Sequence, residues 1–114
     1  MSAAVFIVYR TRKFDREAKR IWREKDIDRL VEDLSQNPEK GVHLGGGLYK
    51  LRIASHGRGT RGGSRIIYLL ITAAQRVFLL TAYAKNEKED LTKDEYKTLR
   101  AFAEQLRSKG EHNG

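Results

Sequence analysis

The sequence predicts a single α+β domain with the element order β-α-α-β-β-β-α, a mostly antiparallel sheet, and helices packed on one face. A β-rich segment comes first, and two amphipathic helical patterns follow it. Three strand-like segments with short connections and a last amphipathic helix complete the pattern. The 114 residues are the size of one domain, which we place over residues 1–110, with a frayed tail over 111–114.

The first half of the chain contains one expected strand and two expected helices. Residues 4–10, AVFIVYR, are rich in β-branched and aromatic side chains and predict a strand. Apolar residues recur at helical spacing in segments 11–22 and 26–37, which predicts two short helices. Asp26 can cap the first turn of the second helix, and Asn37-Pro38 ends it.

The second half predicts three strands and a helix. Residues 41–47, GVHLGGG, are interpreted as a turn-rich connector. Segment 48–54 alternates apolar and polar residues, whereas segments 64–72 and 76–84 are apolar on both faces and predict buried strands. Thr92 begins a capping-box pattern, and an apolar stripe follows it, so the final helix starts there.

Positive charge is concentrated in one part of the chain. The net charge is +8, and no acidic residue lies between Glu39 and Glu87. A concentrated positive field attracts polyanions, so we expect an anionic partner rather than a merely soluble basic surface. The basic residues in this acid-free segment equal the net charge; they are Lys40, Lys50, Arg52, Arg58, Arg61, Arg65, Arg76 and Lys85.

The segment GRGTRGGSR contains a literal G-x-G-x-x-G at Gly57, Gly59 and Gly62. A dinucleotide-binding turn requires a helix after the glycines, because the pyrophosphate binds at the helix N-terminus. Here a strand-like segment follows, so the match is accidental. The segment is instead interpreted as a hairpin connection whose Arg58 and Arg61 either contact RNA phosphates or only solubilise the tip.

Two neighbouring strands are expected to supply a basic site. Lys50 and Arg52 lie two residues apart on one strand face, about 6.5–7 Å from each other, which is on the order of one nucleotide step. Arg65 opens the next strand and Lys85 ends the last one, so both can join this patch. The alternative is a solvated sheet face. Tyr83 is a candidate for stacking on a base.

No cofactor, metal site or membrane segment is expected. The histidines His43, His56 and His112 lack ligand spacing and carboxylate partners, although His56 is a candidate for contact with the substrate. Trp22 and Tyr68 are assigned to the core. Without a signal peptide or an apolar stretch of roughly 18 residues, the chain is expected to be cytoplasmic.

The motifs LYKLR, RGGSRIIY and YAKNE closely resemble the HigB branch of the RelE-like toxins, which are the toxins of type II toxin–antitoxin pairs. The resemblance covers nearly the whole chain. It implies a ribosome-dependent mRNA interferase that enters the empty ribosomal A site. The implied reaction needs no metal, because the ribose 2′-hydroxyl attacks the adjacent phosphate.

The resemblance also implies site residues. Lys50, Arg52 and Arg65 match the family's basic strand positions, and Lys85 and Asn86 fall in its C-terminal site motif. Relatives in the RelE branch carry an arginine where Asn86 stands and a tyrosine base where Thr92 stands. Lys85 or Lys88 can replace the arginine, and His56 and Lys50 are the candidates for the base.

The implied partners are the ribosome, mRNA and a cognate helix-turn-helix antitoxin, with operator DNA reached only through that antitoxin. A non-catalytic RNA- or ribosome-binding module is the alternative, since it would use the same charges without a base. A structural protein that binds an acidic partner is a third hypothesis.

Overall fold

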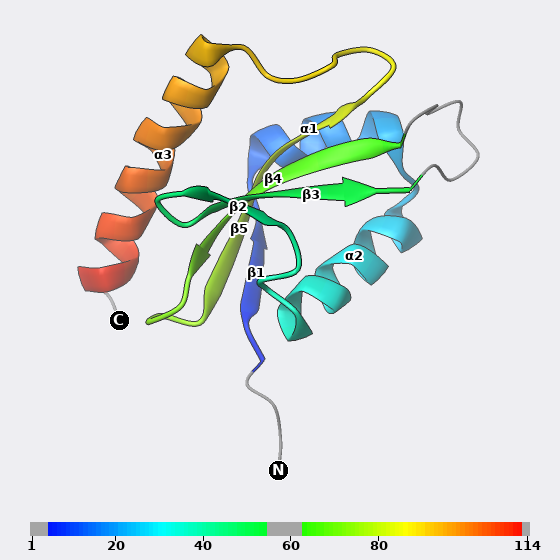
Figure 1. Cartoon of the computed structure of the whole chain (residues 1–114). Coiled ribbons are helices and arrows are strands. Elements are labelled where there is room, and N and C mark those ends of the chain that lie inside the picture. Colours follow the sequence, from blue (N-terminus) through cyan, green and yellow to red (C-terminus); the bar gives the residue numbers. More distant parts are fainter. Residues whose placement is uncertain (1–4, 55–62, 113–114) are drawn as a thin grey trace.

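The computed structural model of the chain describes residues 5–54 and 63–112. Figure 1 shows a sheet with helices on both sides of it. The elements in chain order are β1 (Ile7–Arg10), α1 (Arg12–Ile21), α2 (Glu24–Gln36), β2 (Val42–Gly45), β3 (Leu48–Ile53), β4 (Ser64–Ile71), β5 (Arg76–Ala84) and α3 (Lys93–His112).

The five strands form one sheet in the order β1-β5-β4-β3-β2. β1 pairs with β5 in parallel, and the other neighbours are antiparallel. The α+β class and the mostly antiparallel sheet are therefore as predicted. After α1 and α2 the chain re-enters the sheet at the opposite edge with β2 and runs back through β3 and β4 to β5, which pairs with β1.

The helices cover both faces of the sheet, which corrects the expectation that they pack on one face. α1 and α2 pack against alternate strand residues such as Leu51, Ile66 and Leu79. α3 packs against the residues that point the other way, among them Leu48 and Leu69. The physical reason is that β4 and β5 are apolar on both faces, so each face must be shielded from water.

The connector over residues 41–47 contains a short strand that the sequence did not predict. β2 pairs antiparallel with β3, and its register shifts between His43 and Gly45. The glycines Gly45, Gly46 and Gly47 all have positive φ and form the tight connection into β3. The glycine-rich composition of this segment predicts a connector, although the segment forms a β-hairpin with β3.

Element ends differ from the expected ones by a few residues. β1 begins at Ile7 rather than at residue 4, and α3 continues to His112, beyond the domain end placed at 110. α2 begins at Glu24, and the Asp26 side chain accepts a hydrogen bond from the Arg23 backbone at 3.3 Å. α2 ends at Gln36, directly before Asn37-Pro38, as predicted.

Candidate functional site

Two arginines stand opposite each other on the sheet face that α3 only partly covers. Arg52 of β3 pairs in register with Arg65 of β4, and Arg65 pairs with Tyr83 of β5. The side chains of such cross-strand partners start about 4.5–5.5 Å apart, and like charges in these positions destabilise a sheet. Arg52 is exposed and Arg65 is half-buried. Two guanidinium groups on neighbouring strands are suited to bind one anion between them.

Lys50 lies on the same face, two residues from Arg52 along β3, and pairs in register with Ile67. Its ammonium lies 5.5 Å from the centre of the Tyr96 ring of α3. The side chain is 25% exposed, so its charge is partly withdrawn from solvent. The structure thus brings Lys50, Arg52 and Arg65 together on one face, as the strand alternation predicts.

A carboxylate reaches this face from the loop between β5 and α3, drawn in yellow in Figure 1. One oxygen of Asp90, Oδ1, accepts four hydrogen bonds. The donors are the Tyr96 hydroxyl at 2.7 Å, the Leu91 backbone N–H at 2.8 Å, and Lys50 Nζ and the Tyr83 hydroxyl, both at 3.1 Å. Asp90 therefore joins β3, β5 and the start of α3.

These contacts change the protonation of the cluster. The hydrogen bond from Tyr96 holds the pKa of Asp90 well below its usual range, and Lys50 adds to the effect against the opposing influence of burial. Burial lowers the pKa of Lys50, but its contacts with Tyr96 and Asp90 outweigh burial and raise it. Burial first, and then Asp90, raise the pKa of Tyr83. At neutral pH, Lys50 is a cation and Tyr83 a neutral donor.

A raised pKa argues against Lys50 as the general base, because a base must be deprotonated when the substrate binds. Burial also argues against the stacking role expected for Tyr83. This residue is 7% exposed and its hydroxyl is engaged by Asp90. Its ring therefore offers little surface on which an RNA base could stack.

The C-terminal motif lies at the same end of the sheet as Arg65. The Lys85 backbone N–H donates to the Gly63 carbonyl at 3.1 Å, which connects the end of β5 to the start of β4. The Lys85 ammonium is 3.4 Å from Glu89. Lys88 pairs with Glu95 of α3 at 2.7 Å, and Asn86 is exposed in the turn.

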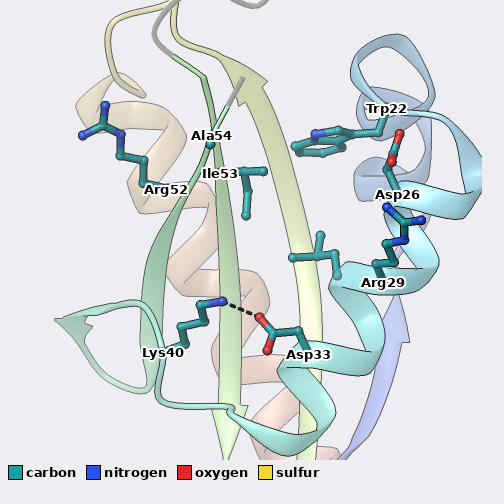
Figure 2. A pocket seen from close by; sticks show the side chains of 9 residues that line it. Trp22, Asp26, Arg29, Asp33, Lys40, Arg52, Ile53 and Ala54 are labelled. Carbon is teal, nitrogen blue, oxygen red and sulfur yellow. Dashed lines mark hydrogen bonds and ion pairs between the residues drawn. The ribbon is translucent and has the colours of Figure 1, made fainter. Parts of the chain in front are cut away.

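Two basic residues of the acid-free segment lie away from Lys50, Arg52 and Arg65. Lys40 pairs with Asp33 at 2.5 Å beside a pocket of about 360 Å³ between α2 and β3. Figure 2 shows that Ile53 points toward Trp22 in this pocket, whereas Arg52 points to the other side of the strand. Arg76 begins β5 and lies 6.0 Å from the ring of Tyr9.

Some predicted positions cannot be compared with the fold. His56, Arg58 and Arg61 lie outside the described residues. Trp22 and Tyr68 belong to the core, as predicted, with exposures of 6% and 0%.

Asp90 and Tyr96 are components of the site that the sequence reasoning missed. Tyr96 falls on the apolar stripe of α3, where it looks like an ordinary core residue. Asp90 is one of several acids in the polar segment KNEKED, and only the path of the loop selects it. Asp90 and Tyr96 are far from Lys50 in the sequence, and no local sequence pattern predicts that they contact it.

The fold agrees with comparisons to known proteins. The model of the family described as the RelE toxin of the RelE / RelB toxin–antitoxin system matches residues 6–113. The structure of a mutant of E. coli toxin RelE in the free state is 12% identical, with a TM-score of 0.56, over 75% of this chain and 88% of that one. A solution structure of HP0892 from Helicobacter pylori is 14% identical, with a TM-score of 0.51, over 72% of this chain and 97% of that one.

The family model covers nearly the whole chain, and the family it describes consists of toxins of toxin–antitoxin systems. The chain belongs to the RelE toxin family. Membership implies an antitoxin as its partner. Within the part of the chain that the structure describes, no helix is both long and apolar enough to cross a membrane.

Proposed function

We propose that this toxin is a ribosome-dependent mRNA endonuclease that acts in the ribosomal A site and cleaves without a metal ion. The family supports a toxin of a toxin–antitoxin system. The observation on this chain that carries the proposal is the cross-strand pair of Arg52 and Arg65, with Lys50 beside it on one open sheet face. The motifs of the sequence favour the HigB branch.

The proposed reaction is an internal transesterification. The 2′-oxygen of one nucleotide forms a bond to the adjacent phosphorus, and the bond from phosphorus to the 5′-oxygen of the next nucleotide breaks. The 2′-hydroxyl loses a proton and the leaving 5′-oxygen gains one. The products are a 2′,3′-cyclic phosphate, which can open to a 3′-phosphate, and a 5′-hydroxyl.

Negative charge grows on the phosphate oxygens as the 2′-oxygen attacks. Arg52 and Arg65 are proposed to contact these oxygens, because guanidinium groups bind phosphate with two parallel hydrogen bonds. Lys50 and Lys85 add positive charge from the two sides. Cations fixed before the reaction stabilise the transition state without reorganising during it. His56 stays the predicted candidate for the base.

The neighbouring residues are proposed to hold the rest of the mRNA. Arg58, Arg61 and Lys88 are proposed to contact RNA phosphates, and the Asn86 amide is proposed to hydrogen-bond to the RNA. The antitoxin is proposed to be a helix-turn-helix protein. In this proposal the toxin contacts operator DNA only through the antitoxin. The cytoplasm, where ribosomes translate, is the proposed compartment.

The test compares cleavage by the wild type and the Arg65→Ala variant on ribosomes programmed with a defined mRNA. We expect wild-type protein to produce new 3′ ends within the A-site codon, carrying a phosphate. Arg65→Ala should reduce the cleavage rate by about 10²–10³-fold, as loss of one transition-state contact typically does.

Arg76→Ala is the matched control, since it removes the same charge from the far end of the sheet, where Arg76 lies near Tyr9. It should cleave like the wild type. Ribosome binding without new 3′ ends, under conditions where the toxin is folded, would favour the non-catalytic module. An equal loss in both arginine variants would assign the effect to overall charge.

A further inference from the structure

The geometry points to Asp90 as a positioning residue that fixes the Lys50 ammonium and the Tyr96 hydroxyl beside the Arg52–Arg65 pair. This inference rests on the proposed nuclease function and deepens it. Asp90 is argued to act through Lys50 and Tyr96. It is therefore not assigned a catalytic role of its own.

The first support is the convergence of donors from three elements on one atom. Asp90 Oδ1 accepts from Lys50 of β3, Tyr83 of β5 and Tyr96 of α3, besides the Leu91 backbone N–H. A whole carboxylate offers about four lone-pair sites over its two oxygens, so four donors on Oδ1 engage this oxygen completely. A swing of the Asp90 side chain would break all four hydrogen bonds together, so its position is strongly determined.

The second support is the environment of Lys50. A lysine ammonium sits on a flexible four-carbon stem and is otherwise free to move. On its own sheet face, its cross-strand partner is the apolar Ile67, and the Tyr96 ring lies beside it. Within residues 5–54 and 63–112, Asp90 is the carboxylate that pairs with Lys50. Asp90 therefore determines where this positive charge stands.

The third support is the cost of placing a carboxylate here. Asp90 partly offsets the positive charge of a face that is proposed to bind phosphate, and its side chain is 51% exposed. Electrostatics alone would disfavour an acid at this place. Its presence is explained if a fixed ammonium contributes more than a mobile one, since misplacement by about 1 Å can reduce a rate by 10²-fold.

The charged and titratable groups facing Asp90 come from each packed element. They are Lys50 of β3, Tyr83 of β5, and Tyr96 of α3, with Arg100 5.8 Å from the Tyr96 ring. Arg65 is close enough to influence Tyr83 electrostatically. Replacing Asp90 by asparagine keeps the shape of the side chain and removes the charge that orders this group.

The test is a double-mutant cycle in single-turnover cleavage on programmed ribosomes, using Asp90→Asn, Lys50→Met and the double variant. We expect Asp90→Asn to lower the cleavage rate at saturating ribosome concentration by about 10–100-fold. The ribosome concentration that gives the half-maximal rate should change little. In the Lys50→Met background, the same change should have almost no further effect. A residue that only stabilises the fold would give the same factor in both backgrounds.

Asp94→Asn is the matched control, because it removes the same charge from the first turn of α3, where Asp94 is exposed. It should cleave as the wild type does. Should Asp90→Asn fail to fold, Tyr96→Phe removes the shortest hydrogen bond to Asp90 and keeps the ring. That variant is expected to show the same loss of saturating rate.

A measurement without RNA separates this inference from the proposed function. In ¹⁵N-lysine NMR, the Lys50 ammonium, assigned by its absence in Lys50→Met, should give a slowly exchanging signal that Asp90→Asn abolishes and Asp94→Asn retains. Absence of cleavage by the wild type would reject the nuclease and leave this result standing. Retention of the signal in Asp90→Asn, or wild-type cleavage by that variant, would overturn the positioning role.

Discussion

The hydroxyl of Tyr68 shows how one buried polar atom fixes a connection between elements. It donates to the Pro38 carbonyl at 2.7 Å and accepts from the Gly41 backbone N–H at 3.0 Å. Both partners lie in the segment that leaves α2 and enters β2. The Tyr68 ring is fully buried and stacks on Tyr49 at 5.3 Å. The core of the sheet therefore holds a segment that lacks regular structure.

Tyr68→Phe should lower the free energy of unfolding by about 1–3 kcal/mol, because it leaves the Pro38 carbonyl and the Gly41 N–H without their buried partner. Urea unfolding followed by circular dichroism measures the change. Tyr9→Phe is the control, since Tyr9 is 38% exposed and its hydroxyl is not part of such a bridge. Equal stability of the two variants would contradict the role of the Tyr68 hydroxyl.

The same variant has a pH signature. Burial raises the pKa of Tyr68 to about 12, whereas an unfolded tyrosine titrates near about 10. The contribution of Tyr68 to stability is therefore complete below about pH 10 and is lost as the pH rises toward 12. Tyr68→Phe should show a smaller loss of unfolding free energy across this window than the wild type does.

At the scale of elements, the apolar pattern of the buried strands predicts how many faces of the sheet must be covered by helices. Segments 64–72 and 76–84 are apolar on both faces, and that pattern already requires cover on both sides of the sheet. The sequence does not show on which side of the sheet the chain crosses after β5, so the expectation of three helices on one face ignores this requirement. The alternation in β3 predicts Lys50 and Arg52 together on one face, and the structure shows that α3 packs on this same face.

The path of the loop between β5 and α3 could not be predicted from the sequence. Alternation and the expected hairpin place Arg65 near Lys50 and Arg52, whereas its register opposite Arg52 comes from the structure. The contact between Asp90 and Lys50 joins residues 40 positions apart. It depends on the path of an irregular loop, and neither periodicity nor composition determines that path.

The β3–β4 connection depends on a glycine beside the site. Gly63 has φ = 77°, and a Cβ atom there would lie 2.3 Å from the Ile53 carbonyl oxygen. Gly63→Ala should therefore destabilise the protein by more than the roughly 1–3 kcal/mol of backbone strain alone, as measured by urea unfolding. Because Gly63 precedes β4 and accepts from the Lys85 N–H, cleavage should also fall.

Gly46→Ala separates backbone strain from the steric clash as causes of the lost stability. Gly46 also has positive φ, at 61°, but a Cβ atom there meets nothing within 4 Å. This variant should show backbone strain without the steric clash, and its cleavage rate should stay at the wild-type level. If the two variants were equally stable, the close approach of Gly63 to Ile53 would not restrict that position.

At the scale of the whole molecule, folding redistributes the charge of the basic segment. Acids from outside the segment pair with three of its lysines: Asp33 with Lys40, Asp90 with Lys50 and Glu89 with Lys85. Among the described residues, no carboxylate lies within ion-pair distance of Arg52. Within the described part of the chain, the positive charge of Arg52 on the open face is therefore not offset by an ion pair, unlike that of these three lysines.

This distribution predicts the salt dependence of RNA binding. The logarithm of the binding constant for single-stranded nucleic acid falls with the logarithm of salt concentration by a slope of about 0.7 per phosphate contact. Removing the Arg52 contact with Arg52→Gln should reduce that slope by about 0.7, as measured by fluorescence anisotropy with a 2′-O-methylated RNA that cannot be cleaved. Arg76→Gln carries the same change in net charge but should leave the slope unaltered, because Arg76 lies near Tyr9 at the far end of β5. An equal decrease of the slope in both variants would mean that the RNA responds to the +8 net charge of the chain as a whole, and that the paired arginines do not bind phosphate individually.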